Sequence, residues 1–517
     1  MKTLLNWVVI GVATTALSAC INLAPHYKRP LAPVPASWPG AGSDRSASDA
    51  TAVSTGATKA TGSKTGVMAA DIGWQSFFVD PRLRQTLSLA LSNNRDLRIA
   101  ILNIEKERAE YRIQRSALFP EIDLGAGQDA ERTPTSVKNA DGSGSTSDTT
   151  SKSSGEIEHI YSANIGTTSY ELDLFGRVRN MSKAAMETYL STMETRRSTQ
   201  ISLVSEVASD WLTLASDKRL LRIAQDTLSS EQRTFALVEQ EHALGAASGL
   251  DYEAARASVQ SARNAAAQAV TTAAQALNAL ELVVGTAVPT ADLPDPQVDP
   301  VASMTSIPAG VPSAVLQQRP DVLAAEHTLI ADNADIGAAR ANFFPTISLT
   351  ALAGFESPAL SSLFTGGNRQ WSFEPNATLP IFDAGANRAT LDASKVTLRI
   401  DVATYEKTIE TAFEEVANAL ATRATINEQL DAQTQAVDAD QHAYDLSMAL
   451  YRQGSESLLD TLTEQRLLFT AQQSLVATQL SAQSSLVTLY TALGGGLDGS
   501  DADRSLHAAS FVGEKLH

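Results

Sequence analysis

Two hydrophobic periods alternate along the chain. Four short stretches alternate apolar and polar residues with a period of two, which predicts strands that present different chemistry on their two faces. They lie at residues 121–127, 170–174, 346–355 and 371–381. They predict two β-hairpins, at about 120–174 and 345–382, each closed by a polar loop. This alternation is typical of membrane barrels, although strands covering a soluble core would show the same period.

A helical period follows each predicted hairpin and continues for an unusual length. Neither proline nor glycine interrupts residues 177–242 or residues 386–453. At ~1.5 Å per residue, each helix would extend roughly 100 Å. The first helix carries two apolar stripes: Ile201, Val204, Ala208, Trp211 and Ala215, and then Leu203, Val207, Leu214, Leu221 and Leu228. Two stripes suit a helix held by neighbours on both sides, like a stave in a tube.

Each long helix ends at a glycine-containing turn, and a second helix returns from it. The turns are residues 245–251 and 454–460, and the returning helices are expected at about 250–284 and 458–493. A serine in each turn suits the N-cap of the returning helix, and an aspartate three residues later suits the positive end of its dipole. Each hairpin of strands is therefore followed by a long hairpin of helices.

The two halves of the chain repeat one another. The matched pairs are Arg115-Ser-Ala-Leu-Phe-Pro120 with Arg340-Ala-Asn-Phe-Phe-Pro345, Leu172-Asp-Leu-Phe175 with Leu379-Pro-Ile-Phe382, and Gly245-Ala-Ala-Ser248 with Gly454-Ser-Glu-Ser457. Three pairs in the same order predict a tandem duplication of roughly two hundred residues. We assign repeat 1 to residues 71–284 and repeat 2 to 313–493. A proline-rich connector, 285–312, joins them, and 494–517 form a C-terminal tail.

The N-terminus predicts lipid attachment. Lys2, a short apolar run and then Leu17-Ser-Ala-Cys20 resemble a lipoprotein signal, and the run is shorter than the ~20 residues of a spanning helix. Residues 1–19 would be removed and Cys20 acylated; the alternative is an ordinary secretory peptide with a chance cysteine. Residues 20–70 would form a lipid-anchored strap and a Ser/Thr/Gly-rich linker. Ile21, where an aspartate would favour the inner membrane, favours the outer membrane.

Composition excludes several classes of protein. The formal net charge of −18 argues against a nucleic-acid partner, and a single cysteine excludes an intramolecular disulfide. The seven histidines are scattered and no catalytic motif is present. We therefore expect no enzyme, no metal site and no cofactor apart from the covalent lipid on Cys20.

Geometry then requires more than one chain. Four strands cannot close a barrel, for which about eight is the practical minimum, and lipid does not tolerate open strand edges. Two chains would give eight strands and three would give twelve. An α+β membrane protein results, in which a β-barrel continues into a tube of helices. A hollow tube of this kind is a conduit.

The sequence resembles a known family, the TolC-like outer-membrane efflux proteins, in their lipoprotein (NodT/OprM-like) branch. The resemblance covers nearly the whole chain and rests on an ordered set of short motifs. These include Cys20 to Pro30, Asn94-Arg-Asp-Leu97, Ala117-Leu-Phe-Pro120, Glu171-Leu-Asp-Leu-Phe-Gly-Arg177, Arg319-Pro-Asp321, Ala338 to Pro345, Leu379 to Gly385 and Ala492 to Gly496.

By this resemblance the chain is a homotrimer with a twelve-stranded β-barrel and an α-helical barrel in the periplasm. It would be the passive exit duct of a tripartite efflux system for drugs or other small molecules. Its partners would be a periplasmic adaptor, an inner-membrane RND-type pump, usually proton-driven, and outer-membrane lipid.

The resemblance also assigns site residues. The helical turns would be the tips that meet the adaptor, through Gly245, Ser248, Leu250, Asp251, Gly454, Ser457, Leu459 and Asp460. Asp445 and Leu446 would form a narrow periplasmic gate, with Asp438 and Asp440 as weaker candidates. The simpler readings are that the turn residues serve only turn and cap chemistry, and that Asp445 is a solvated surface residue.

Other functions stay open on the sequence alone. Within the channel class, the duct could serve metal efflux or type I protein secretion. In a different class, the chain could be a trimeric surface adhesin or a structural lipoprotein, including a soluble periplasmic coiled coil without a barrel. The adhesin is disfavoured because its strands would be contiguous at the C-terminus.

Overall fold

The computed structural model describes residues 22–35, 38, 72–132, 157–297, 300–302 and 313–497. Cys20, the signal segment 1–19, the linker 40–70 and most of the tail therefore lie outside the described residues. The chain divides into two compact units. The sheet unit comprises Met1–Arg29, Glu105–Leu190 and His327–Val402, and the helical unit comprises Pro30–Ile104, Ser191–Glu326 and Ala403–His517.

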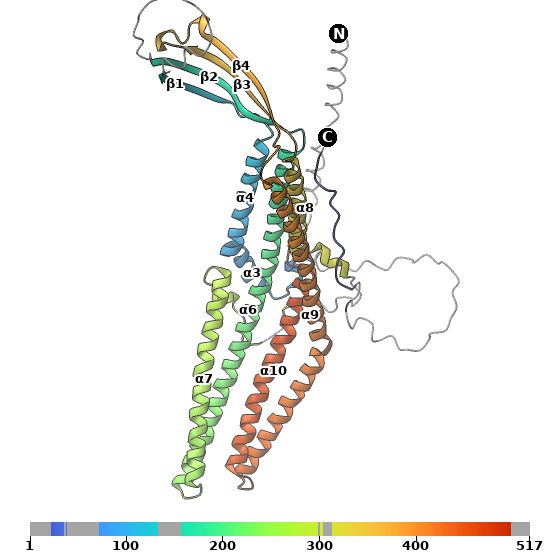
Figure 1. Ribbon diagram of the computed structural model, residues 1–517. Coiled ribbons are helices and arrows are strands. Elements are labelled where there is room, and N and C mark those ends of the chain that lie inside the picture. Colours follow the sequence, from blue (N-terminus) through green and yellow to red (C-terminus); the bar gives the residue numbers. More distant parts are fainter. Residues whose placement is uncertain are drawn as a thin grey trace, which may run out of the picture. The chain divides into compact units, whose positions relative to one another are not determined.

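The strands, the long helices and the returning helices follow the predicted order, and shorter helices precede each hairpin of strands (Figure 1). The helices are α2 (Trp74–Phe77), α3 (Pro81–Asn93), α4 (Arg95–Ser116), α6 (Arg177–Ala243), α7 (Gly249–Val284), α8 (Pro320–Ala341), α9 (Ala386–Arg452) and α10 (Leu458–Ala492). The strands are β1 (Asp123–Arg132), β2 (Ile157–Leu172), β3 (Thr346–Ser357) and β4 (Arg369–Thr378). Short 3₁₀ turns (η2–η5) lie at Thr290–Asp292, Ser313–Gln318, Leu360–Ser362 and Gly366–Asn368. None of the described helices carries an apolar stretch long enough to cross a membrane.

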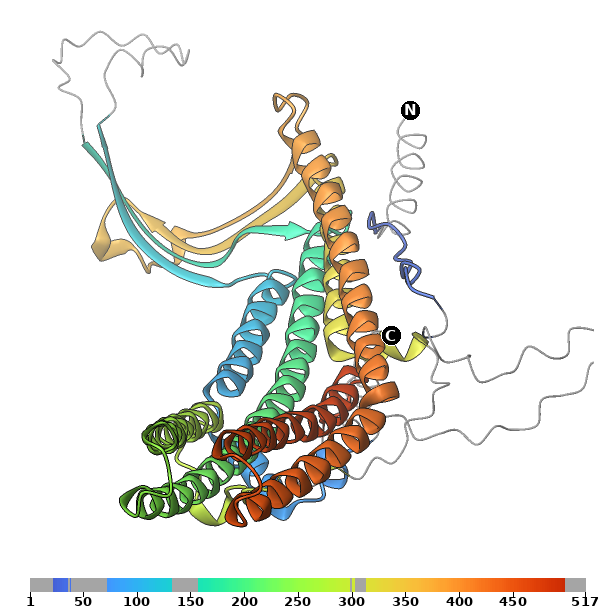
Figure 2. The same cartoon turned by 90° about the horizontal axis from the view of Figure 1, so that it is seen from below.

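The strands of the sheet unit form one antiparallel sheet in the order β1-β2-β3-β4, and the sheet is strongly curved (Figure 2). Paired residues share a face of a sheet. The register pairs Leu124 with Ile165, Ile165 with Ala353, and Ala353 with Trp371. One face therefore collects the apolar residues of all four strands. On the other face Thr350 pairs with Glu374.

A bulge in β2 preserves that apolar face. The register between β2 and β3 shifts between Thr167 and Tyr170, where Ser169 adopts a positive φ of 62°. Before the bulge the odd-numbered Ile165 points to the apolar face, and after it the even-numbered Tyr170 does so. An extra residue in one strand is the usual way to invert this parity. Four apolar residues assigned to the strands by alternation, Ile122, Leu174, Leu379 and Ile381, lie beyond the strand ends.

Two glycines permit the close pairing of β2 with β3. A Cβ atom at Gly166 would lie 2.0 Å from the Ala351 carbonyl oxygen, and one at Gly354 would lie 2.1 Å from that of Ala163. Neither neighbour can move away without breaking the sheet, because both are backbone atoms.

Charged side chains fix the junction between strands and long helices. Asp173 accepts hydrogen bonds from the Arg179 backbone N–H (2.9 Å) and from its Nε (3.1 Å). Glu171 forms a two-pronged ion pair with Arg177. In the second repeat Asp383 accepts from the N–H groups of Asn387 (2.8 Å) and Gly385 (2.9 Å), and these bonds lower its pKa. Two family-like motifs thus start the long helices.

The segment after Cys20 lies along α8. Asn333 Nδ2 donates to the Pro25 carbonyl (2.6 Å), and Arg340 Nη1 donates to that of Leu23 (3.0 Å). Between them, a Cβ at Gly337 would lie 2.8 Å from the Ala24 Cα. Spacings of three and four residues place these α8 positions on one face. The start of the predicted strap, residues 23–25, is therefore docked on α8 within the sheet unit.

The helical unit has one large apolar core drawn from α3, α6, α7, α9 and α10. All five residues of the first predicted α6 stripe are buried, as are Leu203, Val207 and Leu214 of the second. This confirms that α6 is packed on two sides there. The Phe77 and Tyr490 rings stack at 3.8 Å between centroids, which joins the short N-terminal helices to α10.

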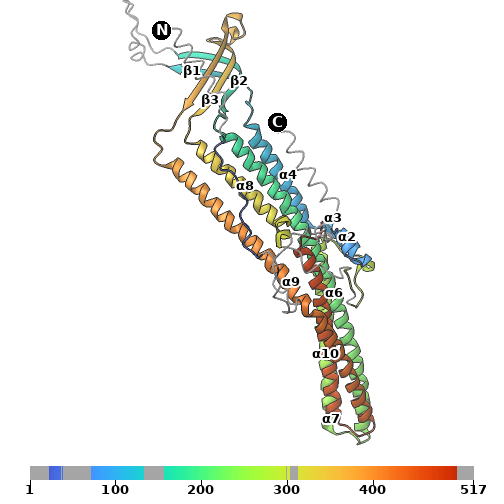
Figure 3. The ribbon, with the colours of Figure 1, turned by 90° about the vertical axis from the view of Figure 1, so that its right-hand side faces the viewer.

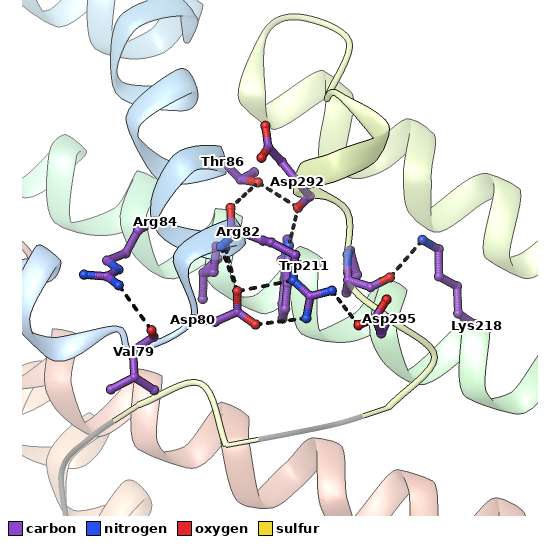
Figure 4. Close-up of polar contacts among 11 residues, drawn as sticks. Val79, Asp80, Arg82, Arg84, Thr86, Trp211, Lys218, Asp292 and Asp295 are labelled. Atoms are coloured by element: carbon purple, nitrogen blue, oxygen red, sulfur yellow. Dashed lines mark hydrogen bonds and ion pairs between the residues drawn. The ribbon is translucent and has the colours of Figure 1, made fainter.

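The connector is tied to α3 and α6 by polar contacts (Figure 4). The Asp292 carbonyl accepts from Trp211 Nε1 (3.1 Å) and from the Thr86 hydroxyl (3.3 Å). The Arg82 guanidinium lies 2.7 Å from Asp295, and it also contacts Asp80, the N-cap of α3. These contacts raise the pKa of Arg82. The connector between the repeats is therefore structural.

We predict that Gly354→Ala weakens the β2–β3 pairing, whereas Gly367→Ala does not. Forcing a methyl group against backbone costs about 1–3 kcal/mol. A Cβ at Gly367, in the loop after β3, has no atom within 4 Å. The measurement is the temperature at which the folded, fast-migrating band on semi-native gels is lost. Equal temperatures for the two variants would contradict the register.

Candidate functional site: the helical tips and the wall above them

The two helical turns are built in the same way, and they lie together at one end of the helical unit (Figure 3). Gly245 and Gly454 have φ values of 76° and 74°, the left-handed conformation that ends many helices. Ala246 N–H donates to the Glu241 carbonyl at 2.8 Å, and Ser455 N–H donates to that of Leu450 at 2.9 Å. The duplication therefore extends to the hydrogen bonds of each turn.

Each returning helix is capped by its predicted serine. Ser248 Oγ and Ser457 Oγ each accept a hydrogen bond from an aspartate N–H, that of Asp251 or Asp460, both at 3.1 Å. The Asp251 carboxylate reaches back to the Ser248 N–H at 3.2 Å, which completes a capping box. The polar residues of the tips thus serve as turn and cap residues, which leaves their apolar neighbours as candidates for contact.

Those neighbours are exposed. Leu244 is 86% exposed, Leu250 79% and Leu459 67%. Directly behind them, Val238, Ala255 and Leu458 are buried in a small cluster that includes Phe235 and Leu462 and joins the two helical hairpins. Each tip therefore exposes leucine side chains next to a buried apolar cluster that holds the helices together.

Two tyrosines of α9, which the sequence did not single out, join the hairpins. Tyr451 Oη donates to Glu241 Oε2 at 2.7 Å, and Tyr444 Oη lies 3.0 Å from Ser230 Oγ. Burial, and then the hydrogen bond to Glu241, raise the pKa of Tyr451, so it stays protonated. Both bonds connect α9 to α6, and the Tyr451 bond lies within a few residues of the turns. No local pattern in the sequence marks these bonds, because they join residues more than 200 positions apart.

The predicted gate residues are exposed on α9. Leu446 is 66% exposed, and Asp445 accepts a hydrogen bond from Gln441 Nε2 of the same helix at 3.1 Å. Asp431 and Asp438 precede Asp445 at intervals of seven and are also exposed. A spacing of seven keeps residues on one helical face. One face of α9 therefore carries a row of three carboxylates, of which the sequence interpretation named two. Asp440 is off this row.

A groove of about 410 Å³ lies between the two hairpins, lined by α6, α7 and α10. Glu231 (5% exposed) and Gln465 (4% exposed) both line it, and each carries a side-chain oxygen without a hydrogen-bond partner in the described part of the chain. Burial raises the pKa of Glu231, although Ser258 opposes the shift. This wall of the groove is therefore polar in a region otherwise rich in alanine.

The family-like Arg319-Pro-Asp321 motif is structural. Arg319 donates to the Ala492 carbonyl at 2.7 Å and contacts Glu415 at 2.8 Å and Asp321 at 2.7 Å. It thereby links the start of α8 to α9 and α10. In the sheet unit, burial and the neighbouring Asp401 raise the pKa of Asp332 to about 7. Among the described residues no three His, Cys, Asp or Glu side chains are placed to hold a metal ion.

Comparisons with known proteins identify the family. The model of the outer membrane efflux protein family matches residues 86–286 and 311–495. The toluene efflux pump outer membrane protein TtgC of Pseudomonas putida is 44% identical over 490 residues, covering 94% of this chain and 95% of that protein. The outer membrane protein OprJ of Pseudomonas aeruginosa is 39% identical over 93% and 94% of the two chains.

A solved structure agrees with these matches. The MtrE outer membrane channel of Neisseria gonorrhoeae, in its open state, has a TM-score of 0.77 and 33% identity, covering 92% of this chain and 99% of that one. The chain belongs to the outer membrane efflux protein family, whose members are channels of the TolC type. It is an outer-membrane efflux channel, which decides against the adhesin and the structural lipoprotein.

Proposed function

We propose that three copies of this chain close one twelve-stranded barrel that continues into an α-helical barrel in the periplasm. The observation that carries this proposal is the single sheet of four strands, in which β1 and β4 each leave one edge unpaired among the residues that the structure describes. Open edges are not tolerated in lipid, and about eight strands is the least that closes. The sheet also has one apolar face that includes Trp371 and Phe373.

We propose that the tips dock a periplasmic adaptor, which connects the channel to an inner-membrane pump of the RND type. The exposed leucines support this, because apolar side chains surrounded by polar residues mark protein interaction sites. The names of the relatives favour small organic molecules as cargo. Metal efflux and protein secretion remain alternatives within the same class. The cysteine that precedes the docked strap would carry the lipid.

We propose that the carboxylate row of α9 lines the lumen and that Asp445 and Leu446 form the closed gate. Three carboxylates near one axis would attract cations and repel one another. The tyrosine bonds to Ser230 and Glu241 would hold α9 against α6 in the closed state. An outward shift of α9 and α10 would then break them.

Replacing both tip leucines by charge, Leu250→Glu with Leu459→Glu, should abolish efflux while trimer and outer-membrane level stay normal. An unpaired carboxylate in an apolar contact costs at least about 2 kcal/mol, or about 30-fold in affinity per contact. The measurement is drug susceptibility together with adaptor co-purification. The control is Leu282→Glu, at a residue of α7 that is 80% exposed near the other end of that helix. Normal efflux in the double variant would reject the tip assignment.

In planar bilayers the protein should show a small conductance that prefers cations. Asp445→Ala should raise that conductance a few-fold and weaken the preference, because the ring becomes wider and loses charge. Tyr451→Phe should raise it without changing ion preference, because only the bond to Glu241 is lost. Asp392→Ala, at an exposed aspartate near the start of α9, is the control. If Asp445→Ala conducts as the unaltered protein does, Asp445 is not in the gate.

A further inference from the structure

The loop between β3 and β4 combines a closed set of polar bonds with exposed apolar side chains. Residues 358–368 contain no charged side chain. Leu360 is 65% exposed and Phe364 is 71% exposed, whereas Leu363 between them is 4% exposed. A loop in water usually shows the opposite arrangement, with polar groups outward.

The polar groups of this loop bond mainly to one another. Asn368 Nδ2 donates to the Ser362 carbonyl (2.6 Å) and to Thr365 Oγ1 (2.9 Å), and Thr365 Oγ1 donates to the same carbonyl (2.6 Å). Ser357 Oγ, on a residue that is 2% exposed, lies 2.6 Å from Ser362 Oγ. Backbone N–H groups of Ser362, Thr365 and Asn368 bond to carbonyls three residues earlier. A non-helical segment in contact with a membrane has to satisfy its polar groups with hydrogen bonds inside the protein, as this loop does.

The exposed ring continues the apolar face of the sheet. Phe364 packs edge-on against Phe355, with 5.4 Å between ring centroids. Phe355 lies two residues after Ala353 on β3, so both point to the apolar face, and Ala353 pairs with Trp371. Continuity with that face, rather than with the polar one, selects lipid as the occupant. Aromatic residues are enriched where a barrel meets the membrane boundary.

We propose that the β3–β4 loop anchors the channel in the outer leaflet by placing Leu360 and Phe364 at the boundary between headgroups and acyl chains. The inference rests on the proposed lipid-facing orientation of the apolar face. Three rigid loops around the rim would oppose tilting of the barrel in the membrane. The loop is thus a lipid contact rather than a lid over the exit.

The test uses the full-length protein in phosphatidylcholine vesicles. A polarity-sensitive fluorophore is attached at Phe364→Cys, Leu360→Cys or Gly367→Cys, and spin-labelled lipids or aqueous iodide serve as quenchers. The chain has a single native cysteine, Cys20, so unaltered protein taken through the labelling reports any background. Labels at 364 and 360 should be quenched several-fold more by lipid spin labels than by iodide. The label at 367, beside open space in the same loop, should show the reverse order.

A label at Trp371→Cys, on the apolar face, separates this inference from the proposed barrel. Lipid quenching at 371 with iodide quenching at 360 and 364 would overturn the anchor and leave the barrel intact. Disulfide-linked oligomers of Phe364→Cys would also overturn it, because the loops would then meet one another over the exit. Iodide quenching at 371 as well would overturn the barrel itself.

Discussion

The assembly of this channel depends on the unpaired backbone at the two edges of a four-stranded sheet. One face of that sheet collects apolar residues from all four strands, yet within the described residues β1 and β4 each leave a row of N–H and C=O groups without partners. In hydrocarbon each such group costs several kcal/mol, so a single copy could not remain inserted. Copies that associate through their strands would also bring their long helices together, because α6 and α9 begin only a few residues after β2 and β4. The proposed association of copies, with its hollow interior and helical tube, would follow from this one backbone constraint.

Duplication gives one chain two copies of the same unit of strands and helices, so that fewer chains are needed to close a barrel. Each repeat supplies two strands, one long helix and one returning helix, and the same turn closes both hairpins, with Gly245 and Gly454 in the left-handed conformation. The two repeats differ at the start of their long helices and in the contacts that those helices make near the turns. Glu171 and Asp173 hold the start of α6 through two arginines, whereas Asp383 alone caps α9. At and above the tips, α9 supplies both tyrosines that bridge to α6.

The sequence predicted what depends on local pattern. The predicted ends of the long and returning helices lie within a few residues of the observed ones, because glycine, proline and serine determine them locally. Burial of Val204 from the first α6 stripe and Val207 from the second confirms that both stripes are packed. Most of β2 was missed, because the bulge near Ser169 inverts the alternation and hides the strand from a period-two reading. The tyrosine bridges and the docking of the strap on α8 were also missed. Both join residues far apart in the sequence, and no local period records such contacts. Asp431 was overlooked, although its spacing of seven from Asp438 was visible.

The most direct test of the central claim is the number of copies in the folded channel. Native mass spectrometry of the full-length protein, released from outer membranes in mild detergent, counts them without assuming a barrel. The account predicts three copies that stay together until heat abolishes the folded gel band. A folded single copy, or a stable pair that conducts in bilayers, would contradict it, because the strand edges would then be satisfied in another way.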